Sequence, residues 1–235
     1  MTLATRIIPT LLVRGRQLVK GKQFNSWRSV GDALQAMKIH QARGVDEIIY
    51  LDIAATPEGR GPDLKMVELM TRDCFCPITV GGGVRSVSDV QDLLNAGADK
   101  VAIKTAAYQN YHLVRDLADK FGSQAIVVAV DYIEAEAPWP IAMNFEDQGA
   151  GEILLTCVDR EGTMRGYDLS NVEEVVAYLD IPVIAHGGCS GYEDMCNAIQ
   201  AGASAVAAGA LFQFTDCTPR GAADYLSERG IEVRR

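Results

Sequence analysis

The sequence predicts an α/β fold, a single (β/α)₈ barrel with a two-fold half-barrel repeat, and three observations support that prediction. Short β-branched segments alternate with amphipathic segments along the whole chain. The first half of the pattern recurs 105 positions later without a gap, so that Glu47 matches Glu152 and Gly82 matches Gly187. The chain has 235 residues, close to the roughly 250 of one barrel. We therefore expect residues 1–235 to form one domain, with an open doubly wound sheet as the less natural alternative.

Eight strands are expected where short runs of β-branched and other apolar residues occur. They are residues 6–13, 47–53, 77–80, 100–104, 125–131, 152–158, 183–186 and 205–209. The amphipathic segments between them predict helices, most of which end near a glycine that stops them. The clearest are residues 88–95, 112–121, 172–179, 192–200 and 222–229. Strand and helix alternate throughout, as a parallel barrel requires.

Composition excludes several function classes. The net charge of −9 and the pI near 4.8 argue against binding to nucleic acid. No apolar run approaches the roughly 20 residues that cross a bilayer, and the first residues show no signal-peptide pattern, so we expect a cytoplasmic protein without a membrane partner. The six cysteines include one close pair, Cys74 and Cys76, and are expected to be reduced packing residues. We expect no metal and no cofactor.

Glycine-rich segments follow two matched strands. In a barrel, ligands bind at the carboxyl ends of the strands, where backbone N–H groups of glycine-rich loops can hold a phosphate. Two matched residue sets fall at such ends, here called the first cradle (Gly82, Gly83, Lys104 and Thr105) and the second cradle (Gly187, Gly188, Gly209 and Ala210). They predict an elongated ligand with a phosphate at each end. The simpler alternative is that these glycines serve turns with positive φ. The first cradle carries a lysine, and the second is expected to lack a cation.

Several runs of the chain together resemble the cyclase subunit of imidazole glycerol phosphate synthase, the HisF family. They are residues 6–8, 18–21, 46–53, 81–84, 97–100, 121–124, 149–156 and 159–163, and the likeness covers essentially the whole chain. Members of that family are two-fold barrels that bind a bis-phosphorylated substrate and receive ammonia through the barrel. The resemblance therefore implies two partners, a phosphorylated small molecule and a HisH-like glutaminase docked on the opposite face.

The resemblance also implies an acid/base pair of aspartates, one on the first strand and one on the fifth. Asp131 ends the fifth expected strand and matches one of them, but Leu12 stands where the other belongs. A leucine cannot transfer a proton. Each general acid or base contributes about 10² to 10⁴ in rate, so the family reaction should be strongly slowed. Lys20, Asp52 and Glu161 are candidate substitutes. Asp131 alone is also compatible with a strand-end acid that is bound only by loop donors.

The mouth departs from the family pattern at two further places. The family usually has asparagine where Lys104 stands, and it has a longer segment than the 17 residues between Asp131 and Gly149. That segment contains Trp139 and Pro140, which are expected in a loop over the barrel. His186 ends the seventh expected strand and is expected either to touch a phosphate or to fill the barrel rim.

The opposite face keeps the family pattern. Arg6, Glu47, Lys100 and Glu152 match the ring of charges that forms the ammonia gate in the family. On physical grounds alone they are charges at strand starts that must pair when they are buried. Asp99 is expected to take part in partner docking, although a solvated surface acid is the simpler interpretation.

An ammonia gate without the full acid/base pair predicts a glutaminase-dependent ammonia conduit. The pair Leu11-Leu12 and residues 59–63 resemble barrels encoded with surface-polysaccharide enzymes, which are thought to deliver ammonia to a sugar-amidating enzyme. One alternative is a true cyclase, a lyase of histidine biosynthesis, in which Asp131 works with a substitute group. Another is a non-catalytic regulator that binds a phosphosugar.

Overall fold

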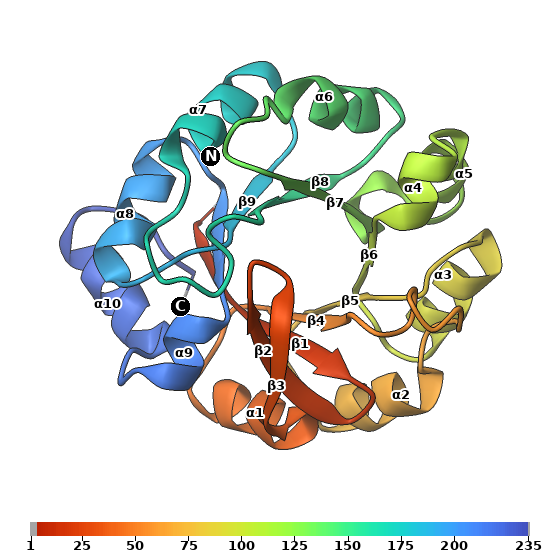
Figure 1. Cartoon of the computed structure of the whole chain (residues 1–235), viewed down its shortest axis with the longest axis horizontal. Coiled ribbons are helices and arrows are strands. Elements are labelled where there is room, and N and C mark those ends of the chain that lie inside the picture. The colour runs from red at the N-terminus through yellow and green to blue at the C-terminus, as the bar shows by residue number, and fades with distance from the viewer. Residues whose placement is uncertain (1–3, 235) are drawn as a thin grey trace.

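The computed structural model describes residues 4–234 and confirms the (β/α)₈ barrel. The parallel strands are hydrogen-bonded in the order β10-β9-β8-β7-β6-β5-β4-β1, and the barrel closes because β1 also pairs with β10. The closing register runs from Arg6 opposite Ala205 to Pro9 opposite Ala208. The helices form an outer ring around the strands (Figure 1). Residues 1–3 and 235, which the expected domain included, lie outside the described range.

All eight expected strands are present, and their ends differ from the expected ones by no more than one residue. They are β1 (Arg6–Arg14), β4 (Ile48–Asp52), β5 (Ile78–Gly81), β6 (Lys100–Ile103), β7 (Ile126–Tyr132), β8 (Glu152–Cys157), β9 (Val183–His186) and β10 (Ala205–Ala208). Each of these strands pairs with its barrel neighbours in parallel. Because successive side chains of a strand point to opposite faces, they alternate between the barrel interior and the helices.

The five expected helices are α3 (Val87–Asn95), α5 (His112–Phe121), α7 (Leu169–Tyr178), α8 (Tyr192–Gln200) and α10 (Pro219–Glu228). The structure adds α1 (Ala33–Ala42), α2 (Leu64–Asp73), α4 (Thr105–Gln109), α6 (Trp139–Asp147), α9 (Ala210–Phe214) and a 3₁₀ turn at Ser123–Ala125.

The expectation of a loop at Trp139 and Pro140 is wrong, because these residues begin α6. Proline is tolerated there, since the first helical turn needs no N–H donor. The Trp139 ring stacks on Tyr178 of α7 with 4.3 Å between ring centroids. The shortened segment therefore packs as a regular helix of the outer ring.

An antiparallel hairpin, not anticipated from the sequence, follows β1. It consists of β2 (Gln17–Lys22) and β3 (Asn25–Asp32), and β2 pairs with β1. The turn residues Gln23 and Phe24 have φ of 52° and 58°, as a two-residue hairpin turn of this hand requires. The hairpin projects over the barrel mouth, the end where the strands' carboxyl termini lie (Figure 1). There Gln23 N donates to Glu161 O at 2.9 Å, so hairpin and β8–α7 loop form one cover.

The barrel interior is apolar between its two ends. Its cluster consists of Ile8, Ile49, Ala102, Val127, Ala129, Leu154, Ile184, Ala205 and Ala207. A larger apolar layer lies between the strands and the helices. Within residues 4–234, no helix has the length and apolar character needed to cross a membrane.

His40 of α1 is buried in that outer layer. Its ring packs edge-on against Phe212 with 6.1 Å between centroids, and its Nδ1 has no hydrogen-bond partner within the described range. Burial, with a smaller contribution from Arg43, lowers the pKa of His40 to about 4. The unfolded chain binds this proton near pH 6.5, so stability contributed by the neutral ring is present above that pH and is lost as pH falls toward 4.

We predict that His40→Leu reduces the acid sensitivity of folding. Between pH 7 and pH 5 the unmodified protein should lose about 2 kcal/mol more unfolding free energy than the variant, because only its unfolded state gains the His40 proton. Urea unfolding at the two pH values measures this difference. His112→Leu, at an exposed position of α5, is the control. Equal losses in His40→Leu and the unmodified protein would contradict the prediction.

Candidate functional site

Four charged side chains meet at the amino-terminal end of the barrel. Arg6 Nη1 lies 2.7 Å from Glu47 Oε2, and Arg6 also pairs with Glu152. Lys100 Nζ lies 3.2 Å from Glu47 Oε2 and 2.9 Å from Glu152 Oε2. Thr79 Oγ1 donates to Glu47 Oε1 at 2.7 Å. The sequence-predicted set is therefore one closed array, here called the charge ring, in which each cation bridges both carboxylates.

The two carboxylates of the charge ring are buried. Glu47 and Glu152 are 2% and 4% exposed, so they need opposite charges to remain ionised. Burial opposes ionisation of Glu47, yet Lys100 and Arg6 hold the pKa of its carboxyl below the ordinary value. Beyond the charge ring the side chains inside the barrel are apolar, and several of them are alanines. The ring thus separates solvent from an apolar core.

Asp99 is exposed beside the ring, and its carboxylate already has a partner in this chain. Its Oδ2 accepts a hydrogen bond from Ile78 N at 2.8 Å, which joins the starts of β5 and β6. Its part in partner docking stays a prediction.

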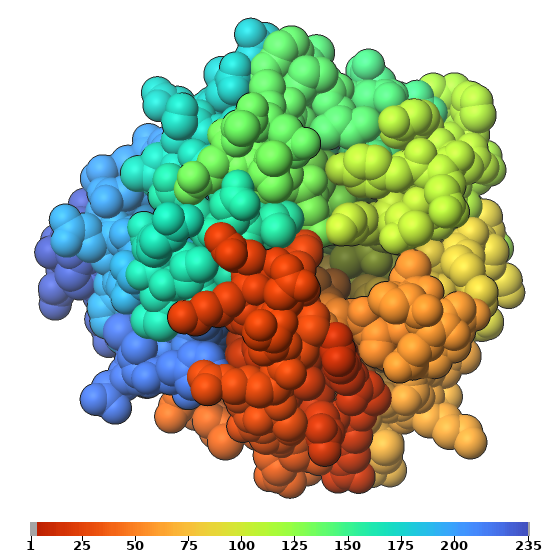
Figure 2. Space-filling model, viewed as in Figure 1, coloured from red at the N-terminus to blue at the C-terminus, as the bar shows by residue number. Residues whose placement is uncertain are grey.

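The barrel mouth holds a cavity of about 420 Å³ beside the hairpin. Figure 2 shows the hollow next to the red hairpin. Leu12 and Asp131 both line it, as do all four residues of the first cradle. The hairpin adds Phe24 and Trp27, which the sequence analysis missed although two aromatic residues in a polar segment were a signal. The mouth therefore combines the apolar side chains of Leu12, Phe24 and Trp27 with the carboxylates of Asp52 and Asp131.

Asp131 is engaged by Lys104. The Lys104 ammonium forms an ion pair with Asp131 Oδ2 and lies 5.6 Å from the centre of the Phe24 ring. The lysine predicted as a phosphate ligand thus has a carboxylate partner in this structure, and its binding to phosphate stays a prediction. The ion pair therefore occupies one oxygen of the Asp131 carboxylate.

The proposed substitutes for the missing aspartate are distributed over two places. Asp52 lines the mouth cavity, but Arg60 binds it through two contacts, with 2.7 Å from Nη1 to Oδ2 and 3.0 Å from Nη2 to Oδ1. Lys20 and Glu161 lie instead at the second cradle, where Glu161 lines the cavity.

The paired glycines are required by the backbone path itself. Gly82 and Gly187 have φ of 115° and 92°, and a Cβ at Gly187 would lie 2.7 Å from Cys157 O. Gly83 and Gly188 also have positive φ and backbone neighbours too close for a side chain. The turn interpretation alone accounts for all four glycines, so phosphate binding at the cradles stays a prediction.

The second cradle contains a basic group, which corrects the expectation that it lacks one. Lys20 is buried, its Nζ has no hydrogen-bond partner among residues 4–234, and a Cβ on Gly209 would collide with it. Burial lowers the pKa of Lys20. Beside it, His186 accepts or donates one hydrogen bond with Thr156 Oγ1 at 3.1 Å, while burial lowers its pKa.

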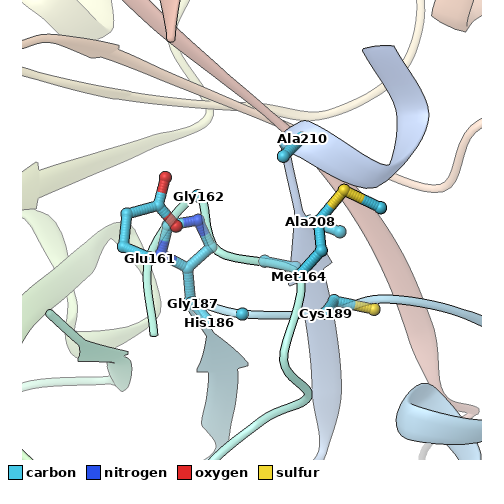
Figure 3. A pocket seen from close by; sticks show the side chains of 11 residues that line it. Glu161, Gly162, Met164, His186, Gly187, Cys189, Ala208 and Ala210 are labelled. Atoms are coloured by element: carbon cyan, nitrogen blue, oxygen red, sulfur yellow. The ribbon is translucent and has the colours of Figure 1, made fainter. Parts of the chain in front are cut away.

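The second cradle is closed over. Glu161, Met164 and His186 surround a cavity of about 10 Å³ (Figure 3), which is room for one water. A Cβ on Gly162 would collide with the carbonyl oxygen of Gly21, so the hairpin lies directly on this loop. A cavity of this size does not admit a phosphate. Within the described range, no three His, Cys, Asp or Glu side chains are grouped as metal ligands.

We predict that Glu47→Ala destabilises the protein by about 3 kcal/mol, because it leaves two half-buried cations sharing one carboxylate. Urea unfolding followed by tryptophan fluorescence measures the loss. Asp73→Ala removes the exposed ion pair with Lys38, whose atoms lie 2.8 Å apart, and should cost far less. Similar losses in the two variants would show that the charge ring adds no more to folding than a surface pair.

Comparison with known proteins agrees with this geometry. The family model described as Histidine biosynthesis protein matches residues 6–218. The imidazole glycerol phosphate synthase subunit HisF of Dictyoglomus thermophilum is 41% identical over 249 residues, covering 99% of this chain and 99% of that protein. With its closed barrel and these matches, the chain belongs to the histidine biosynthesis protein family and is a relative of HisF.

Proposed function

We propose that this barrel receives ammonia from a HisH-like glutaminase at its amino-terminal face and passes it through the interior to the mouth. The observation that carries the proposal is the charge ring placed directly before an apolar interior. The Dictyoglomus relative is named as a subunit of a synthase, which supports a partner subunit for this chain as well.

The interior favours ammonia over ammonium. A neutral molecule enters an apolar core at far lower cost than an ion does. A path for ammonia through the interior needs small side chains, and Ala102, Ala129 and Ala207 provide them. Lys100 is the most exposed member of the charge ring, at 22%, and it is bonded to both carboxylates. Displacement of Lys100 would open the ring while Arg6 still holds Glu47 and Glu152.

The residues at the mouth favour a role in ammonia delivery over the ring-closing reaction of the HisF family. Leu12 is apolar and Asp131 is paired with Lys104, so no free pair of carboxylates faces the cavity. We propose that the ammonia acceptor is a sugar bound to an amidating enzyme of surface-polysaccharide biosynthesis. The support for that assignment is the resemblance of Leu11-Leu12 and residues 59–63 to such barrels.

The second candidate is the cyclase subunit itself, acting as a lyase in histidine biosynthesis. Identity of 41% along the full length of a HisF favours it. In that case Asp131 would serve as one acid/base group and Asp52 would have to leave Arg60 to serve as the other. Both candidates share the glutaminase partner and a phosphorylated ligand at the mouth.

We predict that the purified protein, supplied with ammonium salt, does not turn over the bis-phosphorylated substrate of the family. Leu12→Asp alone should remain poor, because Lys104 still binds Asp131. Leu12→Asp with Lys104→Asn should raise turnover by about 10²-fold or more, since a second proton-transfer group then faces a free Asp131. Lys104→Asn alone is the control. Ordinary turnover by the unmodified protein would contradict the conduit and support the cyclase.

A further inference from the structure

Two cysteine thiols touch on the amino-terminal face of the barrel, in the connection between α2 and β5. Cys74 Sγ and Cys76 Sγ lie 3.5 Å apart, and both side chains are half-buried. Phe75 between them is 86% exposed, and its N–H donates to Gln41 Oε1 of α1 at 3.2 Å. The thiols are therefore close together and accessible at the edge of the molecule.

The local backbone explains why the thiols meet. Cys74 ends α2 in an extended conformation, with φ −105° and ψ 123°. Pro77 follows Cys76, and a residue before proline is restricted to extended backbone. Side chains two positions apart on an extended chain point to the same side. The helix end and the proline thus hold the two thiols in contact.

The contact between the two thiols should make them differ in reactivity. Hydrogen bonding by Cys76 lowers the pKa of Cys74 to about 7, against the opposing effects of burial and of Asp99. The same interaction raises the pKa of Cys76. A thiol with a pKa near neutrality is partly thiolate, and the thiolate is the attacking species in disulfide exchange. Formation of a disulfide needs the sulfurs to approach by about 1.5 Å, to the usual 2.05 Å.

We propose that Cys74 and Cys76 are a reversible dithiol–disulfide site that reacts with small disulfides. The Cys74 thiolate attacks one sulfur of oxidised glutathione, and one glutathione thiolate leaves. Cys76 then loses its proton and attacks Cys74 Sγ, which breaks the mixed disulfide and releases the second glutathione. The protein loses two protons and two electrons, and the oxidised glutathione takes them up to become two glutathione thiols.

The site adds a redox-dependent constraint to the face that carries the charge ring. Asp99, next to Lys100, is the charged neighbour of both cysteines. A disulfide would fix the backbone on either side of Phe75, which with Lys38 and Gln41 lines a surface hollow of about 410 Å³. This inference stands whether the mouth serves ammonia delivery or ring closure.

Oxidised glutathione followed by alkylation and intact-mass measurement tests the site. The unmodified protein should lose about 2 Da and two alkylatable thiols, with no glutathione retained. Cys76→Ser should retain one glutathione on Cys74, because the resolving thiol is missing. Cys74→Ser should react at least about tenfold more slowly, since the remaining thiol is mostly protonated. Cys217→Ser, at a half-buried cysteine elsewhere, should behave as the unmodified protein.

Three results would overturn the proposal. Glutathione that stays on the unmodified protein would show that Cys76 cannot reach Cys74. Equal rates for Cys74→Ser and Cys76→Ser would show that the two thiols do not differ as attacking groups. An unmodified protein that resists oxidised glutathione while its denatured form reacts would show that the folded chain does not support the exchange.

Discussion

Two buried carboxylates at the amino-terminal end of the barrel constrain which side chains of the strands point into its interior. Glu47 and Glu152 can be buried as ions only because Arg6 and Lys100 each bridge both. That requirement fixes the inward direction of the side chains at the starts of β1, β6 and β8 and of Glu47, just before β4. Since side chains alternate along a strand, the same choice determines the inward residues at the mouth. Leu12 lies on the inward face of β1 for this reason.

The mouth departs from the family pattern at Leu12 and at Lys104, and both departures disfavour the family's acid/base chemistry. Leu12 stands where the family resemblance implies one acid/base aspartate, and Lys104 binds Asp131, which matches the other. The two cradles differ as well, although the chain repeats itself. The first opens into a cavity of about 420 Å³, whereas Lys20 and the hairpin close the second around about 10 Å³. The two-fold repeat of the sequence therefore does not give two equivalent cavities.

Some of this was predictable from the sequence and some was not, for physical reasons. Barrel strands are buried on both faces, so their β-branched runs were visible. The charge ring was implied by the family resemblance, and its pairing was expected of charges at strand starts. The hairpin was not visible, because β3 carries mostly exposed polar residues and its turn, Gln23-Phe24, lacks the usual glycine. The position of Lys20 on β2, beside the second cradle, had no signal for the same reason. The pairing of Lys104 with Asp131 joins two strands and has no local signal.

We propose that the charge ring marks the face on which a glutaminase docks. Hydrogen exchange during titration with a HisH-like glutaminase subunit tests this most directly. The account predicts a one-to-one complex with protection at the starts of β1, β4, β6 and β8 and no change in the β2–β3 hairpin. Absence of a complex, or protection confined to the mouth, would contradict it.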